Sequence, residues 1–146
     1  MLNSDYIYQQ ISIEIRPFFH IEMPKIPKEY AALLDNIAQA IMIINRFARL
    51  NKAITLFVGT FPLSVTLPHS RLAVEILEPA LHISVENWIF LDLDQLFLVS
   101  PPLQRACVLE ELAHSVMNIA DEHLVKVMVA EMLPDVIYQN GQLCPL

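Results

Sequence analysis

The spacing of hydrophobic residues changes along the chain, and each change predicts a different secondary structure element. Between Tyr6 and Arg16, Ile11, Ile13 and Ile15 alternate with polar residues. This period of two predicts a half-buried strand. From Glu29 to Leu50 the apolar residues recur at i, i+3 and i+4 on more than one face, which predicts a long helix that is covered on two sides or packed on a sheet.

The middle of the chain is rich in predicted strands. The expected segments are Ile54 to Val58, a turn and return within Gly59 to Thr66, Leu72 to Ile76, Leu81 to Val85 and Ile89 to Leu93. The first is a nearly continuous apolar run, as expected of a strand that is buried on both faces. A short helical or irregular connection from Asp94 to Val99 follows.

The last third of the chain predicts two helices and a hairpin. Ser100 and Pro101 are typical of a helix start, and Asp121 is a good N-cap for a helix from Glu122 to Leu133. Asn140-Gly141 indicates a tight β-hairpin. The order of elements predicts one α+β domain over residues 1–146, with a small mixed or antiparallel sheet packed against a long helix.

Composition narrows the classes of function. Hydrophobic residues make up 55% of the 146 residues, charged residues only 17%, and the net charge is −7. A small chain this apolar is expected to cover surface against a partner, so we expect a homodimer or a protein complex. Scattered basic residues argue against nucleic acid and anionic membranes as partners. No signal sequence or membrane span is predicted, and two isolated cysteines favour a reducing cytoplasm.

The only segment that combines several chemically useful side chains at a meaningful spacing is the helix from Pro101 onward. Its apolar stripe leaves Glu110, Glu111 and His114 on another side, within about a third of a turn of one another. Two carboxylates and an imidazole are therefore expected to converge on one face of an otherwise apolar helix.

The run Glu110-Glu111-Leu112-Ala113-His114 resembles the active-site helix of zincin metallopeptidases, which carry the motif H-E-x-x-H. The resemblance places Glu111 at the general base and His114 at the second zinc ligand, and Glu110 replaces the first histidine. The preceding strand and the following helix agree with a small zincin. No third ligand stands at a family spacing, although Asp121, Glu122, His123, Glu131 and Asp135 lie downstream.

Three interpretations follow from this segment. In the first, the scaffold is a pseudoenzyme without a cofactor that binds an extended peptide by an edge strand, as an accessory factor in peptide maturation. Trp88, Phe90 and Asp92 are then the expected peptide-binding residues. In the second, Glu110 and His114 still bind Zn²⁺, and Glu111 activates water for peptide or amide hydrolysis.

In the third interpretation the cluster is structural and serves folding or oligomerisation only. A histidine beside acidic residues on a buried helix forms hydrogen bonds and ion pairs, and a nearby basic residue neutralises the carboxylates. Arg71, Arg105 and Lys126 are the residues expected to do so.

Overall fold

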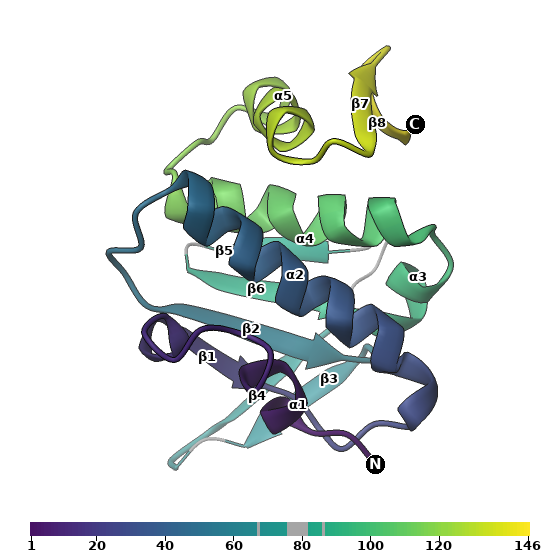
Figure 1. The fold of residues 1–146 in the computed structure, drawn as a ribbon. Coiled ribbons are helices and arrows are strands. Elements are labelled where there is room, and N and C mark those ends of the chain that lie inside the picture. Colours follow the sequence, from purple (N-terminus) through teal and green to yellow (C-terminus); the bar gives the residue numbers. More distant parts are fainter. Residues whose placement is uncertain (67, 76–81, 86) are drawn as a thin grey trace.

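A computed structural model describes the chain except residues 67, 76–81 and 86 (Figure 1). The helices are α1 (Ser4–Tyr8), α2 (Ala31–Phe47), α3 (Leu93–Phe97), α4 (Pro101–Val116) and α5 (Glu122–Met132), with 3-10 turns η1 (Arg16–Phe18) and η2 (Lys28–Tyr30). The strands are β1 (Phe19–Glu22), β2 (Ile54–Gly59), β3 (Leu63–Thr66), β4 (Arg71–Val74), β5 (His82–Val85), β6 (Trp88–Asp92), β7 (Val136–Gln139) and β8 (Gln142–Pro145).

The main sheet is mixed and has the order β1-β2-β6-β5. β1, β2 and β6 run parallel, and β5 pairs antiparallel with β6 at one end of the sheet. β3 and β4 form a separate hairpin, so the chain does turn after Gly59, but its return strand pairs with β4. The α+β class and the mixed sheet predicted from the sequence are confirmed.

The helices form two layers on one side of the sheet. α2 and α4 pack side by side over the sheet, and α5 with the β7–β8 hairpin lies on the far side of α4 (Figure 1). One core cluster of buried hydrophobic residues runs from Ile7 to Val136 through these elements. α4 is therefore buried on both sides, which explains why its polar residues Glu110 and Glu111 are each only 7% exposed.

The prediction of a strand between Tyr6 and Arg16 is wrong. The segment contains the end of α1, turns and the first residue of η1. Ile7, Ile11 and Ile15 are buried, whereas Ile13 is 69% exposed. The buried positions thus recur every four residues. The isoleucines at every second position include these buried ones, which is why they resembled the pattern of a strand.

Tyr8 of α1 covers the β1 end of the sheet. Its hydroxyl accepts a hydrogen bond from the N–H of Ile21 (2.8 Å) and donates one to the carbonyl of Phe19 (3.1 Å). A strand at the end of a sheet normally exposes such groups to pairing with another chain. The hydroxyl occupies two of them on β1.

Within the described residues, no helix has both the length and the apolar character that a membrane span requires.

Candidate functional site

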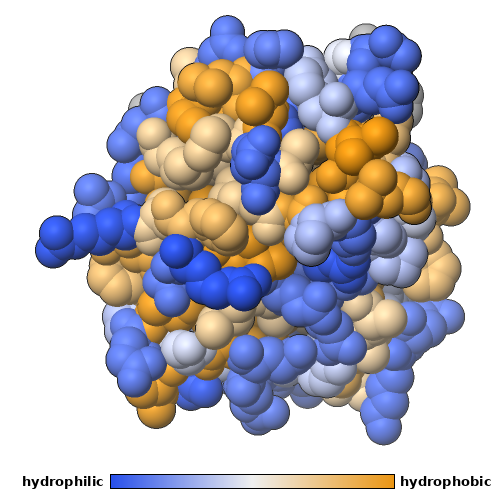
Figure 2. Space-filling view, turned by 45° about the horizontal axis from the view of Figure 1, so that its top comes forward, coloured by the Kyte–Doolittle hydropathy of each residue, from blue (hydrophilic) through white to orange (hydrophobic). Residues whose placement is uncertain are grey.

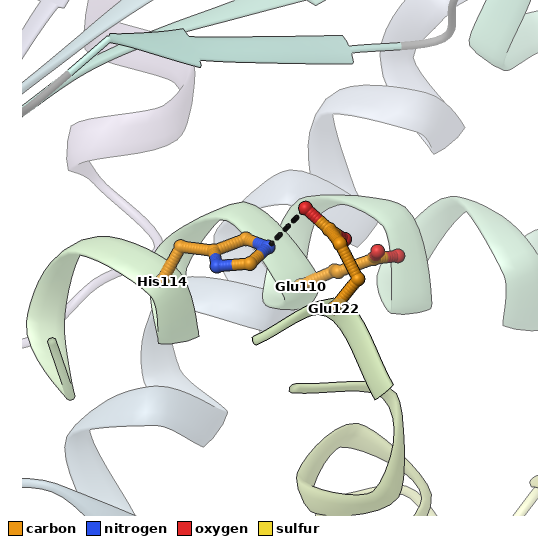
Figure 3. Close-up of side chains that lie close together, drawn as sticks. All are labelled: Glu110, His114 and Glu122. Carbon is orange, nitrogen blue, oxygen red and sulfur yellow. Dashed lines mark ion pairs between the residues drawn. The ribbon is translucent and has the colours of Figure 1, made fainter. Parts of the chain in front are cut away.

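α4 brings Glu110 and His114 to one face because they are four residues apart. Ser100 precedes the helix, and Pro101 occupies its first turn, where an absent N–H costs nothing. This face of α4 is turned toward α5, away from the sheet (Figure 3). Glu110 and His114 therefore lie together, as predicted, on the side of α4 that faces α5.

Glu122 at the start of α5 completes a group of three. Asp121 caps α5 by accepting a hydrogen bond from the N–H of Leu124 (2.7 Å), and this fixes where the helix begins. One ligand atom each from Glu110, His114 and Glu122 lies within 4.8 Å of the other two (Figure 3). From the sequence, Glu122 is only one of several acidic residues downstream of the motif.

The orientation of His114 is fixed by the turn after α4. Asn118 adopts a left-handed conformation (φ 55°), which reverses the chain after the helix. The carbonyl of Ile119 thereby lies 2.5 Å from Nδ1 of His114. Nδ1 must donate to this oxygen, because a carbonyl only accepts. Nε2, on the other side of the ring, lies 3.3 Å from a carboxylate oxygen of Glu122.

These donors fit a divalent ion such as Zn²⁺ in chemical type. Zinc accepts imidazole nitrogen and carboxylate oxygen at about 2.0–2.2 Å, so two ligands of one tetrahedral ion lie about 3.4 Å apart. The separation between His114 Nε2 and Glu122 matches that value. A hydrogen bond from the other ring nitrogen to a carbonyl is also the usual arrangement around zinc-bound histidine.

Lys126 introduces a second cation into the same group. Its ammonium lies 3.4 Å from Glu110 Oε1 and 3.8 Å from Glu122 Oε2, one turn along α5. Glu122 and Lys126 are four residues apart on α5, and Lys126 also reaches the buried Glu110. An ammonium at this distance neutralises the carboxylates and would repel a metal ion.

Glu111 does not belong to this group. Its side chain is buried and has an interaction partner. In the described part of the chain, the set of ligand atoms that lie close together contains Glu110, His114 and Glu122 without Glu111. The geometry therefore does not bring the proposed general base together with the proposed metal ligands.

The other downstream candidates have separate roles. Asp121 caps α5, His123 hydrogen-bonds the hydroxyl of Tyr138 at 2.7 Å, and Asp135 forms an ion pair with Arg105. Arg105 also donates to the side chain of Asn36 at 2.8 Å. Of the basic residues expected to neutralise the cluster, Lys126 does so, whereas Arg105 binds elsewhere.

Trp88, Phe90 and Asp92 lie on β6 and are not brought to the cluster. Their neighbours Ile89 and Leu91 point into the helix-covered core, so the side chains of Trp88 and Phe90 point to the other face of the sheet. There Phe57 packs against both rings, with centroids 5.4 Å from Trp88 and 4.8 Å from Phe90.

Asp92 is the N-cap of α3. Its carboxylate accepts a hydrogen bond from the N–H of Asp94 at 3.1 Å, and its residue is 9% exposed. Burial raises the pKa of Asp92, although hydrogen bonds from the N–H groups of Gln95 and Asp94 counteract part of the effect. These observations give Asp92 a structural role.

The sequence named Lys126 as one of three basic residues that could neutralise the cluster and Glu122 as one of several downstream acids, but it did not place either beside Glu110. Their i, i+4 spacing is visible, but their approach to Glu110 depends on the turn between α4 and α5. A left-handed asparagine in that turn has no strong sequence signature.

Comparison with known proteins gives no family for this chain. It matches no protein-family model, no curated protein and no solved structure.

Proposed function

We propose that this protein is a non-catalytic peptide-binding module, in which an extended peptide adds to β5 at the end of the main sheet. The observation that supports this best is a difference between the two edge strands of the main sheet. The β1 end is closed by the Tyr8 hydroxyl, whereas β5 is the last strand at the other end in the described part of the sheet. Strand addition uses main-chain hydrogen bonds and therefore requires no reactive group.

The Lys126 ammonium supports a role without catalysis. In a zincin-like scaffold, the two carboxylates and the imidazole would face a metal ion. Here a covalently attached cation already lies within 4 Å of Glu110 and Glu122. Glu111, the residue that the resemblance assigns to water activation, is outside the group.

Hydrogen exchange tests strand addition directly. Peptides selected from a random twelve-residue library are added to the full chain, and amide protection is measured residue by residue. We expect new protection at His82–Val85 and none at Phe19–Glu22, which serves as the internal control. A library without binders, or protection at β1 instead of β5, would contradict the proposal.

A pair of proline variants sharpens this test. Ile83 and Ser84 are adjacent on β5, and the N–H groups of successive residues in a strand point to opposite sides. Only one of Ile83→Pro and Ser84→Pro therefore removes an N–H that faces β6. The variant that keeps its thermal stability should lose peptide binding by tenfold or more.

A second candidate function is a zinc-dependent hydrolase. It is favoured by the hydrogen bond from His114 Nδ1 to Ile119, which prepares Nε2 as a ligand beside Glu110 and Glu122. Bound zinc would supply a polarised water for attack on an amide. Two carboxylate ligands donate more negative charge than the two histidines of the motif, so that water would be less acidic.

Metal analysis separates the two candidates. The untagged protein is purified without chelators and its zinc content is measured, and zinc binding is then followed by calorimetry. The hydrolase requires near-stoichiometric zinc, loss of zinc in His114→Ala and cleavage of peptides by the loaded protein. His123→Ala is the matched control, because His123 lies on α5 outside the group.

A further inference from the structure

A pocket of about 210 Å³ lies on α2, on the side where the segment after α1 packs against it. The lining residues come from two parts of the chain: Gln10 from the turn after α1, and Ala38, Gln39, Met42, Ile43 and Arg46 from α2. Gln10 follows Tyr8, whose hydroxyl binds β1. The pocket therefore belongs to the β1 side of the molecule, and β5 is at the opposite end of the main sheet.

The pocket has an apolar floor and a polar rim. Gln39, Met42, Ile43 and Arg46 stand at i, i+3, i+4 and i+7 on one face of α2. Ile43 is buried and Met42 is half-buried, whereas Gln39 and Arg46 are exposed. The Met42 sulfur accepts a hydrogen bond from the N–H of Ser12 at 3.4 Å, which holds the floor in place. α2 lies at the front of Figure 1, and Figure 2, turned by 45°, shows hydrophobic side chains beside strongly hydrophilic ones.

Arg46 is the one charged residue in the lining of this pocket. The lining contains no carboxylate and no histidine, so its charge does not depend on the protonation state of a neighbour. A guanidinium group stays charged at every pH at which proteins are folded. Among the ion pairs of the described residues, none includes Arg46. Its paired N–H groups are therefore available to an anion.

Arg46 also lies in the last turn of α2, where any cation interacts favourably with the carbonyl end of the helix. That interaction needs only a positive charge, so a lysine would serve it equally well. Binding of a carboxylate is different, because the planar guanidinium offers two N–H groups to the two oxygens. The comparison of arginine with lysine at this position therefore separates the two roles.

Gln10 adds an oriented hydrogen-bonding group to the same pocket. Its Nε2 donates to the carbonyl of Tyr6 at 3.0 Å, which fixes the plane of the amide. Its oxygen accepts no hydrogen bond from the described residues, so it can accept one from a ligand N–H. Gln39 supplies a second carboxamide at the rim. The polar groups of the pocket thus match a carboxylate together with an amide.

We propose that this pocket binds the carboxyl terminus of a peptide whose last residue is apolar. The terminal carboxylate binds Arg46, the last peptide N–H donates to Gln10, and the apolar side chain contacts Met42 and Ile43. The volume is below the 300–1,000 Å³ or so of sites for drug-sized ligands, which suits a single residue. This is a second ligand site, beyond strand addition at β5.

The sign of the charge selects the occupant. An ammonium group would meet the guanidinium and no carboxylate in the lining, and a neutral group would leave the paired N–H groups of Arg46 unused. The net charge of −7 opposes the binding of anions in general. A carboxylate that binds here therefore depends on Arg46 and not on an overall attraction.

The probe is N-acetyl-leucine, which has one carboxylate, one amide and one apolar side chain. Its matched control is N-acetyl-leucine amide, which is neutral. Titrations of the full chain, followed by NMR, measure both dissociation constants. We expect the neutral form to bind at least threefold more weakly, a modest factor because Arg46 is exposed. 4-Methylpentanoate keeps the carboxylate and the apolar chain without the N–H, and should bind at least twofold more weakly than N-acetyl-leucine.

Two substitutions at Arg46 test the contact with the carboxylate. Arg46→Gln should weaken N-acetyl-leucine at least threefold and abolish its advantage over the neutral form. Arg46→Lys keeps the charge at the end of α2, so it should keep the thermal stability and still weaken binding at least twofold. Arg49→Gln is the matched control, because it changes the net charge equally and Arg49 is exposed outside the pocket.

The methionine methyl groups report the location of the ligand without any substitution. In protein labelled with ¹³C at these methyl groups, N-acetyl-leucine should shift the signal of Met42, which lines the pocket. Met128 on α5 is also half-buried but lies elsewhere. Its signal should stay unchanged.

Several results would overturn this proposal. These are equal affinity for N-acetyl-leucine and its amide, tighter binding of 4-methylpentanoate, full binding by Arg46→Lys, equal effects of Arg46→Gln and Arg49→Gln, an unchanged Met42 signal, or no binding at millimolar concentration. Its failure is distinguishable from failure of strand addition. The β5 proline variants should bind N-acetyl-leucine normally, and Arg46→Gln should keep the peptide-induced protection of His82–Val85.

Discussion

At the residue scale, the identity of the cation beside Glu110 decides what the cluster can do. Glu110 is 7% exposed, so its carboxylate needs a partner charge. Lys126 supplies one at 3.4 Å, and Glu122 shares the same ammonium. The internal ammonium and an added cation therefore compete for the same two carboxylates.

Replacing Lys126 with methionine tests this competition. Lys126→Met keeps an unbranched side chain, one atom shorter, and removes its charge. We expect the free energy of unfolding to fall by about 1–3 kcal/mol, because a mostly buried carboxylate loses the ammonium beside it. We also expect Zn²⁺ to bind more tightly and to restore part of the stability.

The control for that experiment is the double variant Glu110→Gln with Lys126→Met. It removes both charges and should unfold closer to the unsubstituted protein, without the gain in zinc affinity. Urea unfolding with and without zinc measures both effects. Equal stability of the single variant and the unsubstituted protein would show that the ion pair is unimportant.

A pH effect is expected at Asp92. Burial raises its pKa above the ordinary value of 3.8, so the folded state holds the proton more tightly than the unfolded state. The contribution of Asp92 to the free energy of unfolding is therefore full below that value and falls as the pH rises through the raised pKa. Asp92→Asn keeps an acceptor for the N–H of Asp94 and cannot ionise.

Thermal unfolding of Asp92→Asn should show a gain in stability at pH 7 that shrinks toward pH 3.5. A variant that is less stable than the unsubstituted protein at pH 7 would mean that the charge of Asp92 stabilises α3.

At the element scale, the sequence pattern located the elements that have a clear hydrophobic spacing or a characteristic turn. The long helix α2, the strands β2 and β6 and the β7–β8 hairpin appear where spacing and turn residues predict them. α1 and η1 were missed because they have only five and three residues, too few to show a helical period in the sequence. The side of the sheet to which Trp88 and Phe90 point could not be predicted either, because it depends on which side the helices cover.

A prediction at this scale concerns the β1 end of the sheet. Tyr8→Phe removes the hydroxyl that binds Phe19 and Ile21, and should lower the free energy of unfolding by about 1 kcal/mol. It should also increase self-association at high concentration, because two backbone groups of an end strand become available.

Tyr6→Phe is the matched control for that variant. The Tyr6 hydroxyl donates to Asp35 at 2.8 Å and is not bonded to a strand. Its loss should leave association unchanged in sedimentation velocity. Association of both variants to the same extent would argue that the hydroxyl of Tyr8 does not protect β1.

At the scale of the whole molecule, the class of fold followed from the order of elements, whereas the site did not. The α+β arrangement needs only the sequence of helices and strands. The group of Glu110, His114 and Glu122 needs in addition the angle between α4 and α5, which the turn at Asn118 sets. Long-range geometry of this kind is not encoded in the spacing within either helix.

The position of α4 between two layers makes a further prediction. Leu109 on α4 is fully buried, and Leu109→Ala should lower the free energy of unfolding by about 2–5 kcal/mol. Leu98, which precedes α4 and is 77% exposed, is the control, and Leu98→Ala should cost less than about 0.5 kcal/mol. Denaturant unfolding measures both, and similar values would contradict the burial of α4.

The turn at Asn118 has a mechanical consequence. α5 follows α4 through this short link and is held to it by the contacts of Glu110, His114, Glu122 and Lys126. A peptide or ion that binds these side chains would therefore link α4 to α5 and oppose their separation. Occupancy should then be visible as slower cleavage of the link by a protease, even if the chemistry of the ligand is unknown.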